Sequence, residues 1–193
     1  MTSLFQGEAL PTNARERILH TAHRLFYAHG IRATGIDKVI AEAGITKVTF
    51  YRHFPSKNEL ILAYLALRHE RWMQWFDATL AAHGGKATAL VPTLKAWFES
   101  DGFRGCAFIN VVNELGEELP EVVAVSQAHK QDMTRAIAAL LPASRQRAAL
   151  AQALAMVVDG AIVQVQMTGD APGALSGLQR VVKALMAPSE KSQ

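Results

Sequence analysis

The sequence predicts an all-α protein of about nine helices, with a small N-terminal helix-turn-helix domain at 1–56 and a larger helical domain at 57–193. Three observations predict this class. Apolar residues recur at helical spacing along most of the chain, and glycine or proline interrupts the pattern at intervals of one helix. Neither strand-like alternation nor an internal repeat is visible. Half of the 193 residues are hydrophobic, which is enough to bury a full core.

The first helix is expected to begin at Asn13, which forms a capping-box-like pair with Glu16, and to end near Gly30. Residues 1–12 are expected to be a frayed arm. One apolar stripe runs along the helix and would brace the segment that follows. Its members are Ile18, Leu19, Ala22, Leu25 and Phe26.

Two short helices follow, and their spacing is typical of a helix-turn-helix. Thr34 can cap the first of them, which stops at Gly44, the residue type that best tolerates a left-handed turn. Thr46 can cap the second, 47–53, before Pro55 ends it. About three residues, including the glycine, join the two helices. The alternative is an ordinary corner of two helices with a solvated basic face.

Six further helices are expected in the remainder. Ser56 and Glu59 form a capping box that opens a long helix, and Ser144 can cap a later one. The segment after Gly169 is expected to be a loop up to Gly173. The predicted ranges are 57–82, 88–100 with Pro92 in its first turn or at a kink, 106–115, 120–141, 144–168 and 174–187.

Charge and cysteine content narrow the class of protein. The formal charge is +3, and residues 1–60 hold eight Lys/Arg against five Asp/Glu, whereas the rest of the chain is balanced. A local basic surface favours a polyanionic partner at the N-terminal domain. A single cysteine allows no internal disulfide, and neither a signal peptide nor a good membrane span is visible. We therefore expect a soluble, cytoplasmic protein without membrane contact.

Residues 14–60 resemble the DNA-binding domain of the TetR family of transcriptional repressors. The resemblance rests on the pattern RIL..A..LF...G, on the Thr34 that opens the second helix, on the alanine-glycine turn, and on FYRHF.SK..L. It covers about a quarter of the chain. Val48 departs from the family, which often has a small residue there, so we expect a change in which bases are read.

The resemblance implies roles for the residues around the second short helix. Thr34, Tyr51, His53 and Lys57 would contact phosphates. Thr46, Lys47, Val48 and Thr49 would reach base edges, with Lys47 donating to guanine and the methyl groups of Val48 and Thr49 meeting thymine. Arg52 could serve either purpose, and Phe50 and Phe54 are expected in the core. The partner would be a palindromic double-stranded DNA operator.

The resemblance also implies a homodimer and a small-molecule effector. Family members dimerise through their last two helices, which here are rich in small and apolar residues and would otherwise need a central position in a monomer. The effector pocket would lie inside the helices between 57 and 168, and its occupation would release the DNA. The candidates for lining this pocket are Trp72, Phe76, Phe108, Asn110, Asn113, His129 and Asp159. Each of them could instead belong to the core.

Other functions are less well supported by the residues. Cys106 follows Arg104 near a helix start, where its thiol could sense oxidants, although a plain buried cysteine is the alternative. No metal-ligand motif, nucleophile elbow or carboxylate pair points to an enzyme, and no cofactor or metal is expected. A transcriptional activator and an architectural DNA-binding protein stay open, because the sequence does not fix the sign of regulation.

Overall fold

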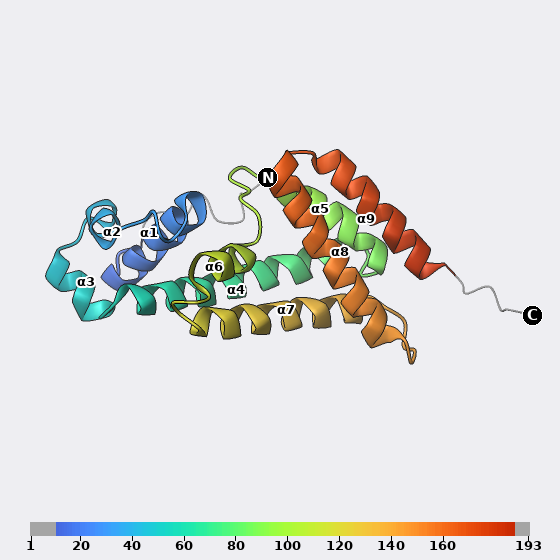
Figure 1. Cartoon of the computed structure of the whole chain (residues 1–193), viewed down its shortest axis with the longest axis horizontal. Helices are drawn as coiled ribbons and strands as arrows, with labels where there is room; N and C mark the ends of the chain where they lie inside the picture. The colour runs from blue at the N-terminus through green and yellow to red at the C-terminus, as the bar shows by residue number, and fades with distance from the viewer. Residues whose placement is uncertain (1–10, 188–193) are drawn as a thin grey trace, which may run out of the picture. The chain divides into compact units, whose positions relative to one another are not determined.

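The computed structural model describes residues 11–187, and all regular structure within that range is helical (Figure 1). The all-α prediction is confirmed. Nine α-helices and one 3-10 helix follow in order: α1 Ala14–His29, α2 Ile36–Ala43, α3 Lys47–His53, α4 Lys57–Ala82, η1 Ala87–Ala89, α5 Leu90–Phe98, α6 Ala107–Leu115, α7 Glu121–Ala139, α8 Arg147–Thr168 and α9 Ala171–Met186. The predicted arm at 1–12 lies almost entirely outside the described residues, as does the end of the tail.

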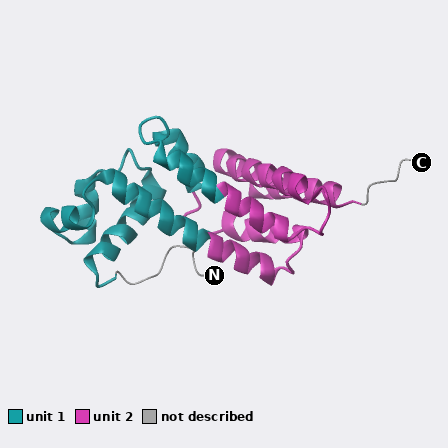
Figure 2. Ribbon diagram, turned by 90° about the horizontal axis from the view of Figure 1, so that it is seen from below, with its two compact units in different colours: residues 1–72, 106–129 teal, residues 73–105, 130–193 magenta. Residues whose placement is uncertain are grey.

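The helices form two compact units, coloured separately in Figure 2. Unit 1 comprises residues 1–72 and 106–129, and unit 2 comprises residues 73–105 and 130–193. Unit 1 therefore holds α1, α2 and α3 together with α6. The contacts divide the chain along this line, whereas the boundary expected at residue 56 stays a prediction.

In unit 1, α1 packs against both α2 and α3, and the three helices enclose a small core. Ile18, Leu25 and Phe26 supply the α1 side of that core and are almost fully buried. Phe50 of α3 and Phe54 after it are 0% and 2% exposed, so both are core residues as expected. Burying side chains of this size holds the short helices in place, since neither would be stable alone.

Most of the predicted caps in this unit are present. The Asn13 side chain accepts the Arg15 N–H at 2.8 Å, and Ser56 Oγ accepts the Glu59 N–H at 3.2 Å. Gly44 closes α2 with φ 62°, in the left-handed region. The predicted Thr34 cap is wrong, because Gly35 occupies the N-cap position of α2. The Thr34 hydroxyl instead donates to the Gly30 carbonyl at 2.7 Å.

Unit 2 is built on α8 and α9, which pack along each other, with α5 against α9. A cluster of aromatic rings adds to its core: Trp97 lies 5.2 Å from Phe103 between ring centroids, and Phe98 lies at the same distance from Phe103. The loop before α6 approaches α8 closely. Gly105 has φ 79°, which disfavours any other residue, and an added Cβ would stand 2.0 Å from the Gln166 side-chain oxygen, so Gln166 would have to move.

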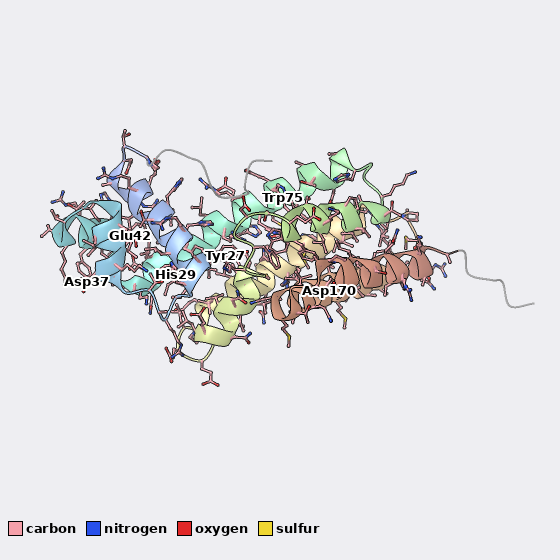
Figure 3. The ribbon with its side chains drawn as sticks, turned by 90° about the horizontal axis from the view of Figure 1, so that it is seen from above. Tyr27, His29, Asp37, Glu42, Trp75 and Asp170 are labelled. Carbon is pink, nitrogen blue, oxygen red and sulfur yellow. The ribbon has the colours of Figure 1, made fainter. Side chains whose placement is uncertain are left out.

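Two helix starts in unit 2 differ from the predictions. α8 begins at Arg147 and not at a Ser144 cap, because the Ser144 carbonyl accepts the Arg147 N–H within a turn. α9 begins at Ala171, inside the predicted loop. The Asp170 side chain caps it by accepting the Gly173 N–H at 2.9 Å, and a proline stands in its first turn (Figure 3).

Among the described helices, α8 has the length and the mean hydropathy, 1.7, of a membrane span, and 39% of that window is buried. Length and apolar composition alone do not distinguish a membrane helix from a core helix of a soluble protein, which meets the same criteria. Polar residues such as Asp159 and Gln164 interrupt the helix. One such helix is weak evidence for a membrane.

Candidate functional site

The recognition helix α3 separates a buried face from an exposed face. Phe50 is fully buried, whereas Val48 is 70% and Tyr51 is 42% exposed. Lys47 and Arg52 are exposed as well. The burial of Phe50 thus fixes the rotation of the helix about its axis. As a result, one hydroxyl-bearing, one apolar and two cationic side chains face solvent.

The N-terminus of α3 is organised by two threonines. Thr46 Oγ1 accepts the Thr49 N–H at 3.1 Å, and the two hydroxyls lie 2.9 Å apart. The predicted Thr46 cap is therefore confirmed. This cap leaves the exposed Lys47 and Val48 in the first turn, the part of a recognition helix that enters the major groove in helix-turn-helix proteins.

The helix-turn-helix is braced by contacts from α1. Arg24 of α1 forms an ion pair with Glu42 of α2, the latter labelled in Figure 3. The hydrogen bond from Arg24 lowers the pKa of the Glu42 carboxyl. The Arg15 guanidinium lies 5.2 Å from the centre of the Phe54 ring, a cation–π contact at the end of α3.

The four expected phosphate contacts differ in accessibility. The Tyr51 phenol is exposed, and its ring packs edge-on against Phe50 at 5.2 Å. His53 is half-buried. The Lys57 ammonium donates to the Ile31 carbonyl at 2.7 Å, and the Thr34 side chain is 0% exposed. The last two side chains are thus engaged inside the protein in this structure.

Three of the expected effector-binding residues come together in unit 1. His129 is 2% exposed, and its ring stacks on Phe108 with centroids 3.7 Å apart. Trp72 stands edge-on to His129 at 5.2 Å, and the Nδ1 atoms of His69 and His129 lie 3.1 Å apart. Sequence reasoning did not select His69. The rings fill the space between them, so this cluster is a packed one.

The other four expected effector-binding residues lie elsewhere. Asn110 lines a small cavity in unit 1, and Asn113 is exposed on the same helix. In unit 2, Phe76 is fully buried, and Asp159 forms an ion pair with Lys130 between α8 and α7. The expected set is therefore not brought into one pocket.

Two of the hollows among the described residues lie near candidate residues or on α8. The first, about 80 Å³, lies between the end of α1, α4 and α6 and is lined partly by Tyr64, Asn110 and Glu114. Burial raises the pKa of the Tyr64 phenol. The second, about 380 Å³, is an open groove on α8 that includes Gly160 and Met167.

Cys106 occupies the N-cap position of α6, in line with its predicted place at a helix start. Its side chain is 4% exposed, so the thiol is shielded from solvent. Burial agrees with the plain core alternative, and a sensing role stays a prediction. Within residues 11–187, no three His, Cys, Asp or Glu side chains gather as a metal site would need.

Sequence reasoning missed a buried polar cluster on α1 and α4. Arg68 is 1% exposed, and its guanidinium lies 3.8 Å from the centre of the Tyr27 ring (Tyr27 is labelled in Figure 3). His23 is buried nearby. Burial, and then the charge of Arg68, lower the pKa of His23 to about 2. An arginine at a core-facing position of a long helix was the available signal.

Comparison with known proteins agrees with this geometry. The model of the bacterial regulatory proteins of the tetR family matches residues 18–64. The solved structure of a TetR-family transcriptional regulator from Streptomyces coelicolor has 32% sequence identity and a TM-score of 0.82, and the match covers 95% of this chain and 97% of that chain. The multidrug binding protein EbrR shares the fold at 23% identity, with a TM-score of 0.70, over 92% of this chain and all of its own.

The chain spans a quarter or less of the length of the first curated relatives that it matches, and about half of a further one. The regulator YxaF of Bacillus subtilis is 45% identical over 47 residues, which are 24% of this chain and 25% of YxaF. The transcriptional activator FasR of Mycolicibacterium smegmatis is 30% identical over 105 residues, 51% of this chain and 48% of FasR.

The fold and the exposed recognition helix define a helix-turn-helix DNA-binding protein with a helical body. The chain belongs to the TetR family of transcriptional regulators. The family and these relatives are regulators of transcription and not enzymes.

Proposed function

We propose that this protein is a ligand-responsive transcriptional repressor, which binds a palindromic DNA operator as a homodimer and leaves it when a small molecule binds the helical body. The observation that carries the proposal is the division of α3 into a buried and an exposed face. Val48 is an apolar residue at 70% exposure on the exposed face, where its methyl groups would be available to thymine methyl groups.

The exposed side chains of α3 divide into two roles. Thr46, Lys47, Val48 and Thr49 stand in the first turn and its cap, so they would read base edges. Tyr51, Arg52, His53 and Lys57 follow and would hold the phosphates. Lys57 would have to exchange its bond to the Ile31 carbonyl or use a second N–H. The buried Thr34 would support this surface by holding the turn.

The homodimer would form along α8. Met156 and Met167 are 68% and 80% exposed on this helix, and Met167 lines the open groove. Gly160 has no atom within 4 Å of the place of a Cβ, so another helix could approach closely there. Since α9 packs beside α8, two copies would form a four-helix bundle. Exposed methionines on a regular helix suit such a contact.

The effector would bind in the helical body, where Trp72, Phe108 and His129 gather with His69. The related EbrR was crystallised with malachite green, an aromatic ligand, which favours an aromatic-lined site here. Because these rings are packed together, ligand entry would have to separate them. Phe76, Asn110, Asn113 and Asp159 would contribute only through a rearrangement, and Cys106 as a sensor is the alternative input.

The sign of regulation is proposed from the family and not from a residue. FasR is an activator. The alternative is therefore that this protein activates transcription from an operator upstream of a promoter. A cytoplasmic location follows from the proposed DNA partner. No cofactor enters the proposed mechanism.

The proposal is tested by selecting bound duplexes from a random-sequence pool with the purified full-length protein at stated salt. A two-fold symmetric consensus with half-sites ~34–36 Å apart is expected, because two recognition helices must enter successive major grooves. Absence of enrichment would contradict operator binding. A reporter with this operator inside a promoter then separates repression from activation.

A further inference from the structure

The carboxylate of Glu114, near the end of α6, binds the turn between α1 and α2. Its Oε2 accepts the backbone N–H of Ile31 at 2.8 Å and that of Arg32 at 3.0 Å. Two successive N–H groups that point at one anion form an anion-binding turn. Glu114 is more than 80 positions away from Ile31 and Arg32 in the chain, and all three residues belong to unit 1.

The contact is reinforced from both sides. The Arg32 Nε donates back to the Glu114 carbonyl at 2.7 Å, and its guanidinium pairs with Glu118 at 2.6 Å. The Lys57 ammonium donates to the Ile31 carbonyl at 2.7 Å from the start of α4. Burial lowers the pKa of Lys57, and the nearby Glu114 charge opposes that shift. We call Ile31, Arg32, Lys57 and Glu114 the Glu114 clamp.

Hydrogen bonds join α6 to the turn beside a small cavity. The cavity of about 80 Å³ lies beside the clamp and is bordered by Gly30, Ile31, Asn110 and Glu114. Gly30 has φ 85°, which disfavours any other residue, and an added Cβ would stand 3.3 Å from the Glu114 carboxylate. The turn is thus shaped to receive the carboxylate beside this small cavity.

We propose that Glu114 is a positioning residue for DNA recognition, through which α6 fixes the orientation of the helix-turn-helix. This inference rests on the proposed function, because it concerns the operator affinity of a dimer with two recognition helices. Charge-assisted hydrogen bonds lose strength steeply with distance and angle. A small displacement of α6 therefore releases the turn, and the two recognition helices no longer hold the separation that a palindrome requires.

The test compares two charge-matched variants of the full-length protein. Glu114→Ala removes the acceptor, and Glu117→Ala removes an equal charge from an exposed position three residues away. Loss of any acidic residue near DNA raises non-specific affinity, so the control variant accounts for that effect. For each protein, we would measure affinity for the selected operator and for unrelated DNA, together with amide exchange at Ile31 and Arg32.

We expect the ratio of specific to non-specific affinity to fall about tenfold in Glu114→Ala and to stay within twofold of the original protein in Glu117→Ala, since losing charged hydrogen bonds costs that order of free energy. Exchange at the two amides should accelerate only in the first variant. Glu114→Gln keeps an acceptor oxygen, so its affinity ratio should lie between those of Glu114→Ala and the original protein. If Glu114→Ala does not fold, the affinity ratio and amide exchange of Glu114→Gln test the inference instead.

An unchanged affinity ratio, or tighter operator binding by Glu114→Ala than by the control, would overturn the inference. Unchanged amide exchange would also overturn it. If the original protein selects no symmetric duplex, the proposed function fails, while the exchange measurement still reports on the clamp by itself.

Discussion

Single residues on α3 carry the clearest consequences for DNA recognition. Val48 is exposed and apolar beside a buried Phe50 and a capping Thr46. Its position in the first turn would put its methyl groups near base edges, whereas Tyr51 lies one turn further along. The two side chains therefore lead to different predictions, one for sequence preference and one for overall affinity.

Val48→Gly should change base preference. Without the methyl groups, discrimination at one base pair in each half-site should fall by about 1–3 kcal/mol, the usual cost of one mismatched pair. Repeated duplex selection with the variant checks this. Val48→Ala is the control for helix propensity, since it shortens the side chain without the flexibility of glycine. An identical consensus for all three proteins would exclude Val48 from base reading.

Tyr51→Phe should weaken binding to all sequences about equally. It removes one hydroxyl, whose hydrogen bond to a phosphate would be worth about 1 kcal/mol, or roughly fivefold in affinity. The ring would keep its contact with Phe50, so folding should not change. Titration of specific and unrelated duplexes measures both affinities. A shift in the selected consensus would instead assign the phenol to a base edge.

His23 should make the protein less stable below about pH 6.5. Burial holds its folded-state pKa near 2, so only the unfolded chain takes up a proton in this range. The stability contribution is full above the unfolded pKa of about 6.5 and falls by about 1.4 kcal/mol for each pH unit below it. Denaturant unfolding between pH 7 and 5.5 measures this loss.

His23→Gln should remove that pH dependence, while the exposed His83→Gln should keep it. Both variants lack one imidazole, so the difference between them isolates burial. If the two variants lose stability in parallel as the pH falls, a group other than His23 titrates in this window.

At the same scale, the sequence predicted the recognition helix better than the contacts of the body. The hydrogen-bond donors of α3 are close together in the chain, so the geometry of the helix alone predicts which of them share a face. Helical spacing places Glu114 on a polar face of α6, yet its partners Ile31 and Arg32 are distant in the chain. No local pattern indicates such a contact.

Among the elements, the turn between α2 and α3 depends on one residue. Gly44 has φ 62°, and no atom lies within 4 Å of the place of its Cβ. Gly44→Ala should therefore destabilise the protein through backbone strain alone, by about 1–2 kcal/mol. Asn visits this conformation more readily, so Gly44→Asn should cost less. Thermal unfolding of the two variants checks the order, and equal losses would point to packing.

Helix ends show which signals in the sequence are reliable. The caps at Thr46 and Ser56 were predicted correctly, because a hydroxyl stands three residues before the N–H that it accepts. Thr34 has the same chemistry but is drawn inward to the Gly30 carbonyl. Asp170 was overlooked because the surrounding glycines and proline favoured a loop, although a proline in the first turn also suits a helix start.

At the scale of the whole molecule, α8 leaves an apolar surface that the rest of the described chain does not cover. It has the mean hydropathy of a membrane span, yet 39% of that window is buried within one chain. Its exposed methionines and open groove need a partner of similar character. In the proposed homodimer, a second copy would supply one through the same helix, as a two-fold interface requires.

Met167→Glu should therefore dissociate the dimer. A carboxylate in the middle of a self-complementary apolar contact faces its own symmetry mate, so the dimer dissociation constant should rise roughly tenfold or more. Sedimentation velocity over a concentration series measures this constant. Ala66→Glu places the same charge at an exposed position on α4 and should leave the dimer intact.

The same variant separates assembly from recognition at the DNA. A single helix-turn-helix is complete in each chain, so Met167→Glu should bind an isolated half-site as the original protein does. Its affinity for the full palindrome should fall toward that of the half-site, because the two heads no longer bind as one unit. If the variant stays dimeric and keeps its affinity for the palindrome, the interface lies on another helix and the apolar face of α8 requires a different partner.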